Sequence, residues 1–211
     1  MKKLCWTATL TLSIFYSLSA YATSTIVTYA FDDGTSFLNP GVTVSDPAIT
    51  TGAWTDNAGT IQSLKGQSGS PGDYAIAATN FVGGNTFHFS ITVNSGSLSL
   101  DGYSFWQQGS GGSKGNGPTD WALSINNQQV ATGSTVLGSP GGAESGPLTL
   151  AGLTGTVDFA ISATGATADS ATWRVDNFSL TGNVSAVPLP PALFLFSSAL
   201  LPLLIRRRRR I

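Results

Sequence analysis

Cysteine, histidine and glutamate are nearly absent from this sequence of 211 residues, which contains one of each. Cys5 stands near the start, so the rest of the chain forms no disulfide and no thiolate metal site. A zinc site or a catalytic triad needs partners that one histidine does not supply, and we expect His88 to be a surface residue on the polar side of a strand. Glu144 stands in a predicted glycine-rich loop, which is a poor place to fix a catalytic acid.

Basic residues are scarce in the middle of the chain. All 11 acidic residues lie within 23–186, where only Lys65, Lys114 and Arg174 are basic, so three positive charges face 11 negative ones for a net −8. A DNA- or RNA-binding body needs a basic face for the phosphates, so we expect no nucleic-acid partner. The same region holds all 25 glycines, yet it keeps the apolar residues that a folded core needs.

The first 22 residues have the layout of a secretory signal peptide. A basic segment at 1–3 precedes an apolar stretch at 4–18, and Ala20 and Ala22 form the small-x-small pattern that signal peptidase accepts. The apolar stretch is shorter than the roughly 20 residues of a membrane-spanning helix. We therefore expect a signal helix that signal peptidase cleaves between Ala22 and Thr23.

The last part of the chain, 187–211, is a second apolar segment, and it ends in a basic cluster. It consists of Val187, Pro188, Leu189, Pro190, Pro191, an apolar run at 192–205, Arg206, Arg207, Arg208, Arg209, Arg210 and a final Ile211. The run is marginal as a permanent span, and the arginines would keep its end in the cytoplasm while everything upstream is exported. This layout is typical of a processing signal, with an uncleaved tail anchor as the alternative.

This tail resembles the PEP-CTERM sorting signal, which is read by the exosortases of Gram-negative bacteria that make extracellular polysaccharide. The resemblance rests on the Pro-x-Pro element at 188–190, the Leu- and Phe-rich segment and the terminal arginines. Leu189 stands where the family usually has glutamate, as in a Val-Pro-Leu-Pro variant of the signal. The resemblance implies a transmembrane sorting helix inserted transiently in the inner membrane, cleavage near the Pro motif by an exosortase-type enzyme, and delivery to the cell surface or exopolysaccharide matrix.

Apolar and polar residues alternate with a period of two through the region 23–186. The clearest runs are 27–31, 87–93, 121–125 and 157–161, and turn clusters rich in Gly, Asn and Ser separate them. No apolar period of 3.6 persists long enough to predict a helix there. We therefore predict one all-β domain at 23–186, an antiparallel β-sandwich of jelly-roll type with roughly eight to eleven strands.

The alternation shifts by one residue at two places. The first shift falls at Asp101 and Gly102, and it predicts either a tight hairpin turn or a bulge within one long strand. The second falls at Asp176 and Asn177 in the last expected strand. A bulge there would turn one of these side chains out of the strand ladder and toward a neighbour.

Acidic residues also close the first expected strand, at Asp32 and Asp33. First and last strands of β-sandwiches commonly lie side by side, and calcium takes six to eight oxygen ligands without needing Cys or His. The pairing with Asp176 and Asn177 resembles calcium-stabilised carbohydrate-binding modules of the jelly-roll type, and it implies a structural Ca²⁺ site at these four residues. Ordinary solvated turns are the alternative, because Asp-Gly and Asp-Asn are common turn pairs.

Trp106 and Trp54 are the candidate platforms for stacking on a sugar ring. Trp106 follows Phe105 on the opposite side of the expected strand and leads into a glycine-rich loop at 109–117, and Trp54 stands among turn residues. An exposed indole stacks well on a sugar, but tryptophan is more often packed in a core, and for these two residues both alternatives stay open.

The sequence as a whole predicts an exported, non-enzymatic protein of the surface or exopolysaccharide matrix, with adhesion or glycan binding as its role. One alternative is a secreted hydrolase that acts through aspartates. Glycoside hydrolysis needs two carboxylates at a set separation, and nothing in the spacing of the aspartates selects a pair. The other alternative is a purely structural coat protein without a specific ligand.

Overall fold

A computed structural model describes residues 24–31, 42–44, 46–67, 73–110 and 115–185. The described residues form eleven strands and one short 3₁₀ turn at Phe81–Gly83, and none of them forms an α-helix. The strands are β1 (Ser24–Tyr29), β2 (Val42–Val44), β3 (Ile49–Thr51), β4 (Thr55–Asp56), β5 (Gln62–Lys65), β6 (Tyr74–Ala78), β7 (Thr86–Gly109), β8 (Asp120–Ile125), β9 (Gln128–Ser134), β10 (Gly142–Thr164) and β11 (Trp173–Ser185). The prediction of an all-β, antiparallel fold is confirmed.

The expected signal peptide at 1–22, its cleavage residues up to Thr23, and the sorting signal at 187–211 lie outside the described residues. Asp32 and Asp33 also lie outside them. Within the described ranges, no helix is long and apolar enough to span a membrane.

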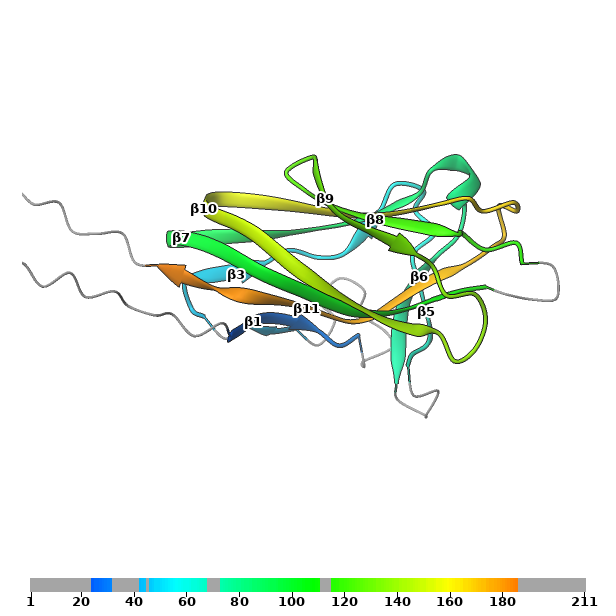
Figure 1. Cartoon of the computed structure of the whole chain (residues 1–211), viewed down its shortest axis with the longest axis horizontal. Helices are drawn as coiled ribbons and strands as arrows, with labels where there is room; N and C mark the ends of the chain where they lie inside the picture. The colour runs from blue at the N-terminus through cyan, green and yellow to red at the C-terminus, as the bar shows by residue number, and fades with distance from the viewer. Residues whose placement is uncertain (1–23, 32–41, 45, 68–72, 111–114, 186–211) are drawn as a thin grey trace, which may run out of the picture.

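Two long strands, β7 and β10, run side by side along the molecule and belong to two layers (Figure 1). In one layer, residues 86–93 of β7 pair with residues 155–164 of β10. Strands β3 and β4 pair with this part of β7. On the other side, β8 pairs with β10, and β9 pairs with β8. We call this the β9 layer. In the other, the remaining parts of β7 and β10 continue through β11 and β1 to β2. We call this the β1 layer. Strands β6 and β5 extend from the start of β11.

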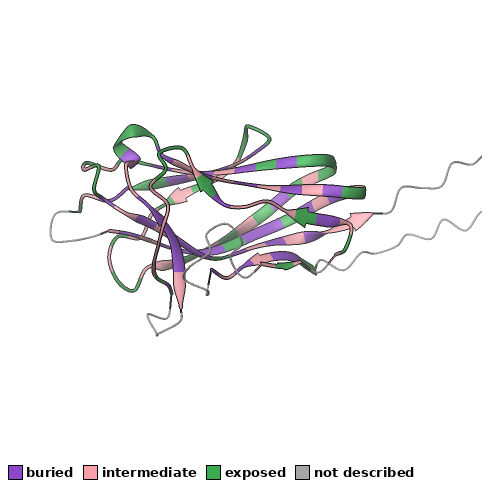
Figure 2. Cartoon of the chain, turned by 180° about the vertical axis from the view of Figure 1, so that it is seen from behind, coloured by how far each residue is buried: buried purple, intermediate pink, exposed green. Residues whose placement is uncertain are grey.

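The core lies between the two layers. Phe89 of the β9 layer contacts Tyr29 and Phe178 of the β1 layer, with ring centroids 5.1 Å and 5.2 Å apart. Phe105 of the β1 layer meets Trp121 of the β9 layer at 5.0 Å. Inward residues therefore interdigitate as in a β-sandwich, and the alternation in the sequence follows from this, because successive side chains of a strand point to opposite faces. Figure 2 shows the resulting alternation of buried and exposed bands along the strands.

Both shifts in the alternation are β-bulges. Strand β7 passes through Asp101 and Gly102 without a turn, and its pairing with β10 and β11 changes register there. The hairpin alternative is therefore wrong. In β11 the register shifts between Asp176 and Ser179, and Asn177 has a positive φ of 50°. A bulge bends its strand and increases the local twist.

Of the two alternatives left open for Trp54 and Trp106, the structure shows the packed one, because they are 0% and 5% exposed. Trp54 stacks on Phe89 at 4.4 Å inside the core. Trp106 does point outward from β7, but the turn before β10 covers it so closely that a Cβ on Gly141 would collide with the indole. Of the Phe, Tyr and Trp side chains that the structure describes, only Tyr74 is not buried.

Candidate functional site

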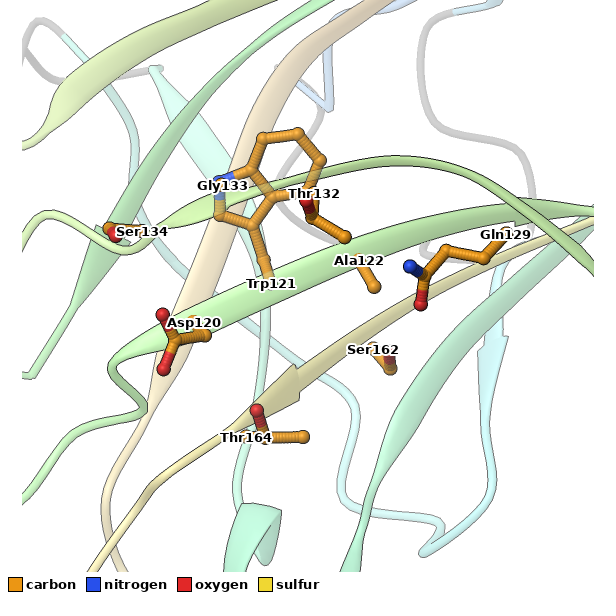
Figure 3. Close-up of a pocket in the computed structure, with 9 residues that line it drawn as sticks. All are labelled: Asp120, Trp121, Ala122, Gln129, Thr132, Gly133, Ser134, Ser162 and Thr164. Carbon is orange, nitrogen blue, oxygen red and sulfur yellow. The ribbon is translucent and has the colours of Figure 1, made fainter.

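The outward side of the β9 layer contains a shallow groove of about 440 Å³. Figure 3 shows its lining on three neighbouring strands, β8, β9 and β10. The lining residues are Asp120, Trp121, Ala122, Gln129, Thr132, Gly133, Ser134, Ser162 and Thr164. Most of these side chains are small and carry a hydroxyl, amide or carboxylate group.

The strand alternation explains why this groove is polar. Residues 121, 123 and 125 of β8 are buried in the core, so Asp120 and Ala122 point outward between them. Asp120 pairs with Thr164 of β10 and Ser134 of β9, and these three side chains form one row across the layer. The side chains of the next row, which passes through Ala122, are equally small. The surface of the layer is therefore hollowed at these two rows.

Trp121 forms the floor of the groove. Its indole lies against Gly133 of β9, where a Cβ would come within 2.7 Å of three ring atoms. The indole Nε1 is buried and has no hydrogen-bond partner among the described residues. Any side chain at position 133 would therefore collide with the indole, so the glycine allows the ring to lie directly against β9.

A second hollow of about 330 Å³ lies on the same side of the β9 layer. Its lining residues are Ala53, Thr55, His88, Phe89, Ser90, Asn127, Asp158 and Phe159. His88 stands between Thr55 of β4 and Ala160 of β10. The prediction that this histidine occupies the polar side of its strand is confirmed, but the imidazole is half-buried and its Nε2 is enclosed without a hydrogen-bond partner in the described part of the chain.

Each hollow contains one carboxylate among its lining residues, Asp120 in the groove and Asp158 in the second hollow. Neither Lys nor Arg lines them, and the cations that the structure describes, Lys65 and Arg174, stand on β5 and β11. Two-carboxylate glycoside hydrolysis requires both groups to flank one bond. The hydroxyl, amide and carboxylate groups of the two hollows can form hydrogen bonds with a hydroxyl-rich ligand.

Glu144 lies on β10 and not in a loop, so that expectation is wrong. Its carboxylate accepts a hydrogen bond of 3.2 Å from Nε2 of the buried Gln107, whose Oε1 accepts one of 3.0 Å from Nε1 of Trp173. Burial and the nearby charge of Glu144 raise the pKa of Tyr103. Glu144 thus belongs to a polar network that orders the β7–β10 pair.

Of the predicted calcium ligands, Asp176 and Asn177 are described, and Asp32 and Asp33 are not. Asp176 is 0% exposed. Its Oδ2 accepts a hydrogen bond of 3.0 Å from the backbone N–H of Gln67, and its Oδ1 accepts one of 2.7 Å from that of Asn177. The bulge in β11 therefore holds this carboxylate inside the protein, next to the end of β5.

Asp73 is a neighbour of Asp176 that sequence reasoning missed. The carboxylates of both residues reach the space that a Cβ on Gly66 would occupy. No signal in the sequence links Asp73 to a residue so far along the chain. No three His, Cys, Asp or Glu residues of the described ranges form a group suited to a metal ion, so the calcium site stays a prediction.

No protein-family model matches the chain, and no curated protein sequence matches it. Among solved structures, the chain is similar to the N-terminal CBM22-1–CBM22-2 tandem domain of Xyn10C from Paenibacillus barcinonensis, with a TM-score of 0.52 and 16% identity over 82% of this chain and 48% of that one. The chain thus spans about half the length of that protein. It is also similar to a family 35 carbohydrate-binding module from Clostridium thermocellum, with a TM-score of 0.40 and 12% identity over 76% of this chain and 98% of that one.

A third similar structure is carbohydrate-binding module CBM36 in complex with calcium and xylotriose, with a TM-score of 0.36 and 14% identity over 61% of this chain and 98% of that one. Of these three TM-scores, 0.52 exceeds 0.5, and at 16% identity that likeness shows the fold alone. The described body has the β-sandwich fold of carbohydrate-binding modules.

Proposed function

We propose that this chain is an exported, non-catalytic glycan-binding module of a polysaccharide-rich bacterial surface. The observation that carries the proposal is the hollowed outward side of the β9 layer. Its two hollows, about 440 Å³ and 330 Å³, have the size of ordinary ligand sites. Hydroxyl, amide and carboxylate groups line them, and these groups can both donate to and accept from the hydroxyls of a sugar.

The binding would rest on hydrogen bonds, because the described part of the chain exposes no tryptophan for stacking. Asp120 is exposed in the groove, and a charged acceptor forms stronger hydrogen bonds with sugar hydroxyls than a neutral one. A single shallow site of this kind binds weakly. Useful attachment to a matrix would therefore come from many copies on one surface.

Affinity electrophoresis of the exported protein, in gels that contain the host's exopolysaccharide or soluble plant polysaccharides, tests this function. We expect at least one polysaccharide to retard the protein, and Gln129→Ala in the groove to weaken the retardation. Gln128→Ala is the matched control, because Gln128 is the exposed neighbour outside the groove lining. An unretarded protein would favour a structural coat role, and release of reducing sugar would favour the hydrolase.

We also propose that an exosortase sorts the protein to the cell surface or matrix through its tail. The Pro-x-Pro element at 188–190 and the arginines at 206–210 support this proposal. The processed surface protein should then lack the residues beyond about Pro190, and its intact mass measures this. Surface material that still carries the arginine cluster would contradict the proposal.

A structural Ca²⁺ ion near Asp176 is the third part of the proposal. Carboxylate and amide oxygens are the donors that calcium prefers, and the Asp176 and Asp73 carboxylates meet at Gly66, beside the side-chain amides of Gln67 and Asn177. The donor chemistry fits the ion. Its role would be to neutralise two neighbouring carboxylates and hold the segments before β6 and within β11 together.

A further inference from the structure

One row of paired residues connects the groove to the second hollow. Gln129 of β9 faces Ser124 of β8, which faces Ala160 of β10. Ala160 in turn faces His88 of β7, and His88 faces Thr55 of β4. Gln129 lines the groove, and His88 and Thr55 line the second hollow. The two hollows therefore lie along a single line that crosses the strands of the β9 layer.

The side chains in the middle of this row project little from the surface of the layer. Ser124 and Ala160 are small and half-buried, so no large side chain of the row stands between the two hollows. Neighbouring strands lie about 4.8 Å apart, and the four strand intervals from β9 to β4 give the row a length of roughly 19 Å. This length exceeds that of one sugar ring several times.

Both ends of the row reach the rim of the layer. Among the strands that the structure describes, β9 is the last one of the sheet beyond β8, and β4 pairs with β7 alone. A ligand that lies along the row therefore continues past either rim without meeting another of the described strands. This geometry accommodates the interior of a long chain and does not require a chain end.

The charges along the two hollows select the type of chain. Asp120 and Asp158 are the charged lining residues, and both are exposed. Neither lysine nor arginine stands among the lining residues to receive a carboxylate or sulfate group. An acidic polysaccharide would bring like charges together over the β9 layer, which is unfavourable, whereas the hydroxyls of a neutral sugar donate to these two carboxylates.

We propose that the two hollows are subsites of one track, which binds a neutral polysaccharide along the interior of its chain. The proposal rests on the glycan-binding function proposed above. It assigns the ligand class, neutral and internal, to residues that the sequence analysis did not connect: Gln129 and Asp120 at one end of the track, and His88 and Asp158 at the other.

The first test compares neutral and acidic polysaccharides in affinity gels, using the exported protein. Xylan, hydroxyethyl cellulose and β-1,4-galactan are the neutral probes, and alginate and polygalacturonate are the acidic ones. We expect retardation by at least one neutral probe and none by the acidic ones. Retardation by the acidic probes alone overturns the proposed ligand class and leaves glycan binding standing, whereas no retardation by any glycan tested overturns both.

The second test blocks the path between the two hollows with a larger side chain. Ala160→Ile places a branched side chain in the middle of the track without offering a ring for stacking, and isoleucine suits a strand. Ser104→Ile is the matched control, because Ser104 is exposed on β7 in the β1 layer. Melting temperatures of both variants show whether they are folded.

The ligands for this second test are a disaccharide and a hexasaccharide cut from the neutral polysaccharide that retards the protein. We expect the wild type to prefer the hexasaccharide, and Ala160→Ile to lower its affinity about tenfold, which is 1.4 kcal/mol, while Ser104→Ile changes nothing. Equal affinity of the wild type for both fragments overturns the track, as does a folded Ala160→Ile variant with undiminished hexasaccharide binding. In either case glycan binding itself remains supported.

Discussion

Two polar clusters hold loops against this sandwich, and they balance their charges in different ways. The Asn85 cluster consists of Asp56, Thr60, Thr79 and Asn85. The Asp176 cluster consists of Gly66, Gln67, Asp73, Asp176 and Asn177. Each is centred on a polar side chain that is nearly inaccessible to solvent, 2% exposed for Asn85 and 0% for Asp176.

The Asn85 cluster is closed by its own hydrogen bonds. Nδ2 of Asn85 donates to Oδ2 of Asp56 and to the backbone oxygen of Thr79, both at 2.8 Å. Its Oδ1 accepts from the backbone N–H groups of Ala58 and Thr86. Burial alone would raise the pKa of Asp56, but the hydrogen bonds from Asn85 and from the segment after Asp56 outweigh it and lower that pKa.

The Asp176 cluster places two carboxylates beside the same glycine. Backbone N–H groups serve both oxygens of Asp176, but two neighbouring negative charges repel each other unless a cation or further donors lie between them. The comparison teaches that an amide beside a carboxylate neutralises no charge but satisfies its hydrogen bonds, whereas two carboxylates side by side form a place where a bound cation would be favourable. The calcium proposal concerns the second cluster only.

Removing the amide should produce the largest effect. Asn85→Ala leaves buried donors and acceptors of Asp56, Thr79 and the backbone without partners, and we expect the free energy of unfolding to fall by about 3 kcal/mol. Urea unfolding measures this change. Asn57→Ala is the control, because Asn57 is exposed in the same loop, and an equal loss in both variants would contradict the role of the cluster.

Removing the buried carboxylate should come next. Asp176→Ala takes the acceptors from the backbone N–H groups of Gln67 and Asn177, and we expect a loss of about 2 kcal/mol in the same measurement. Asp176→Asn keeps one carbonyl acceptor and should lose less. The interpretation fails if the alanine variant is as stable as the wild type in the presence of a chelator.

Calcium should distinguish the two clusters. At ten times its Kd, an ion that binds only the folded state adds about 1.4 kcal/mol of stability, which appears as a rise in melting temperature. Asp73→Asn should abolish this rise, and Asp158→Asn, which alters an exposed carboxylate of the second hollow, should preserve it. If calcium does not change the melting temperature of the wild type, the calcium proposal is wrong.

The smallest of the four effects should be the loss of stability in acid that comes from the Asn85 cluster, because its carboxylate, Asp56, is mostly solvated. The folded-state pKa of Asp56 is lowered, so its stabilising contribution is present above the unfolded-state pKa of 3.8 and is lost as the pH falls through the lower, folded-state value. Asp56→Asn should therefore flatten the pH dependence of the melting temperature below about pH 4. Identical profiles for the variant and the wild type would count against this linkage.

Much of the fold could be predicted from the sequence, because the period of two depends only on the direction of successive side chains along a strand. It indicated which side of β1, β7, β8 and β10 is buried. The two one-residue shifts marked two of the places where the ladder bulges, and at the first of them the sequence left a hairpin turn open as the alternative. The scarcity of histidine and of basic side chains also led us to expect no zinc site and no nucleic-acid partner, and both stay predictions. These conclusions follow from local geometry and composition, which a sequence contains in full.

The tertiary structure alone decided what lies over each outward residue. Trp106 points outward as expected, yet Gly141 of a distant turn covers it, and Asp73 meets Asp176 across a separation of more than one hundred residues. The row from Gln129 to Thr55 likewise exists only because five separate strands pair in one register. Alternation tells which side of its own strand a residue occupies, whereas the neighbour on that side depends on strand order and register, which are set by the packing of the whole sandwich.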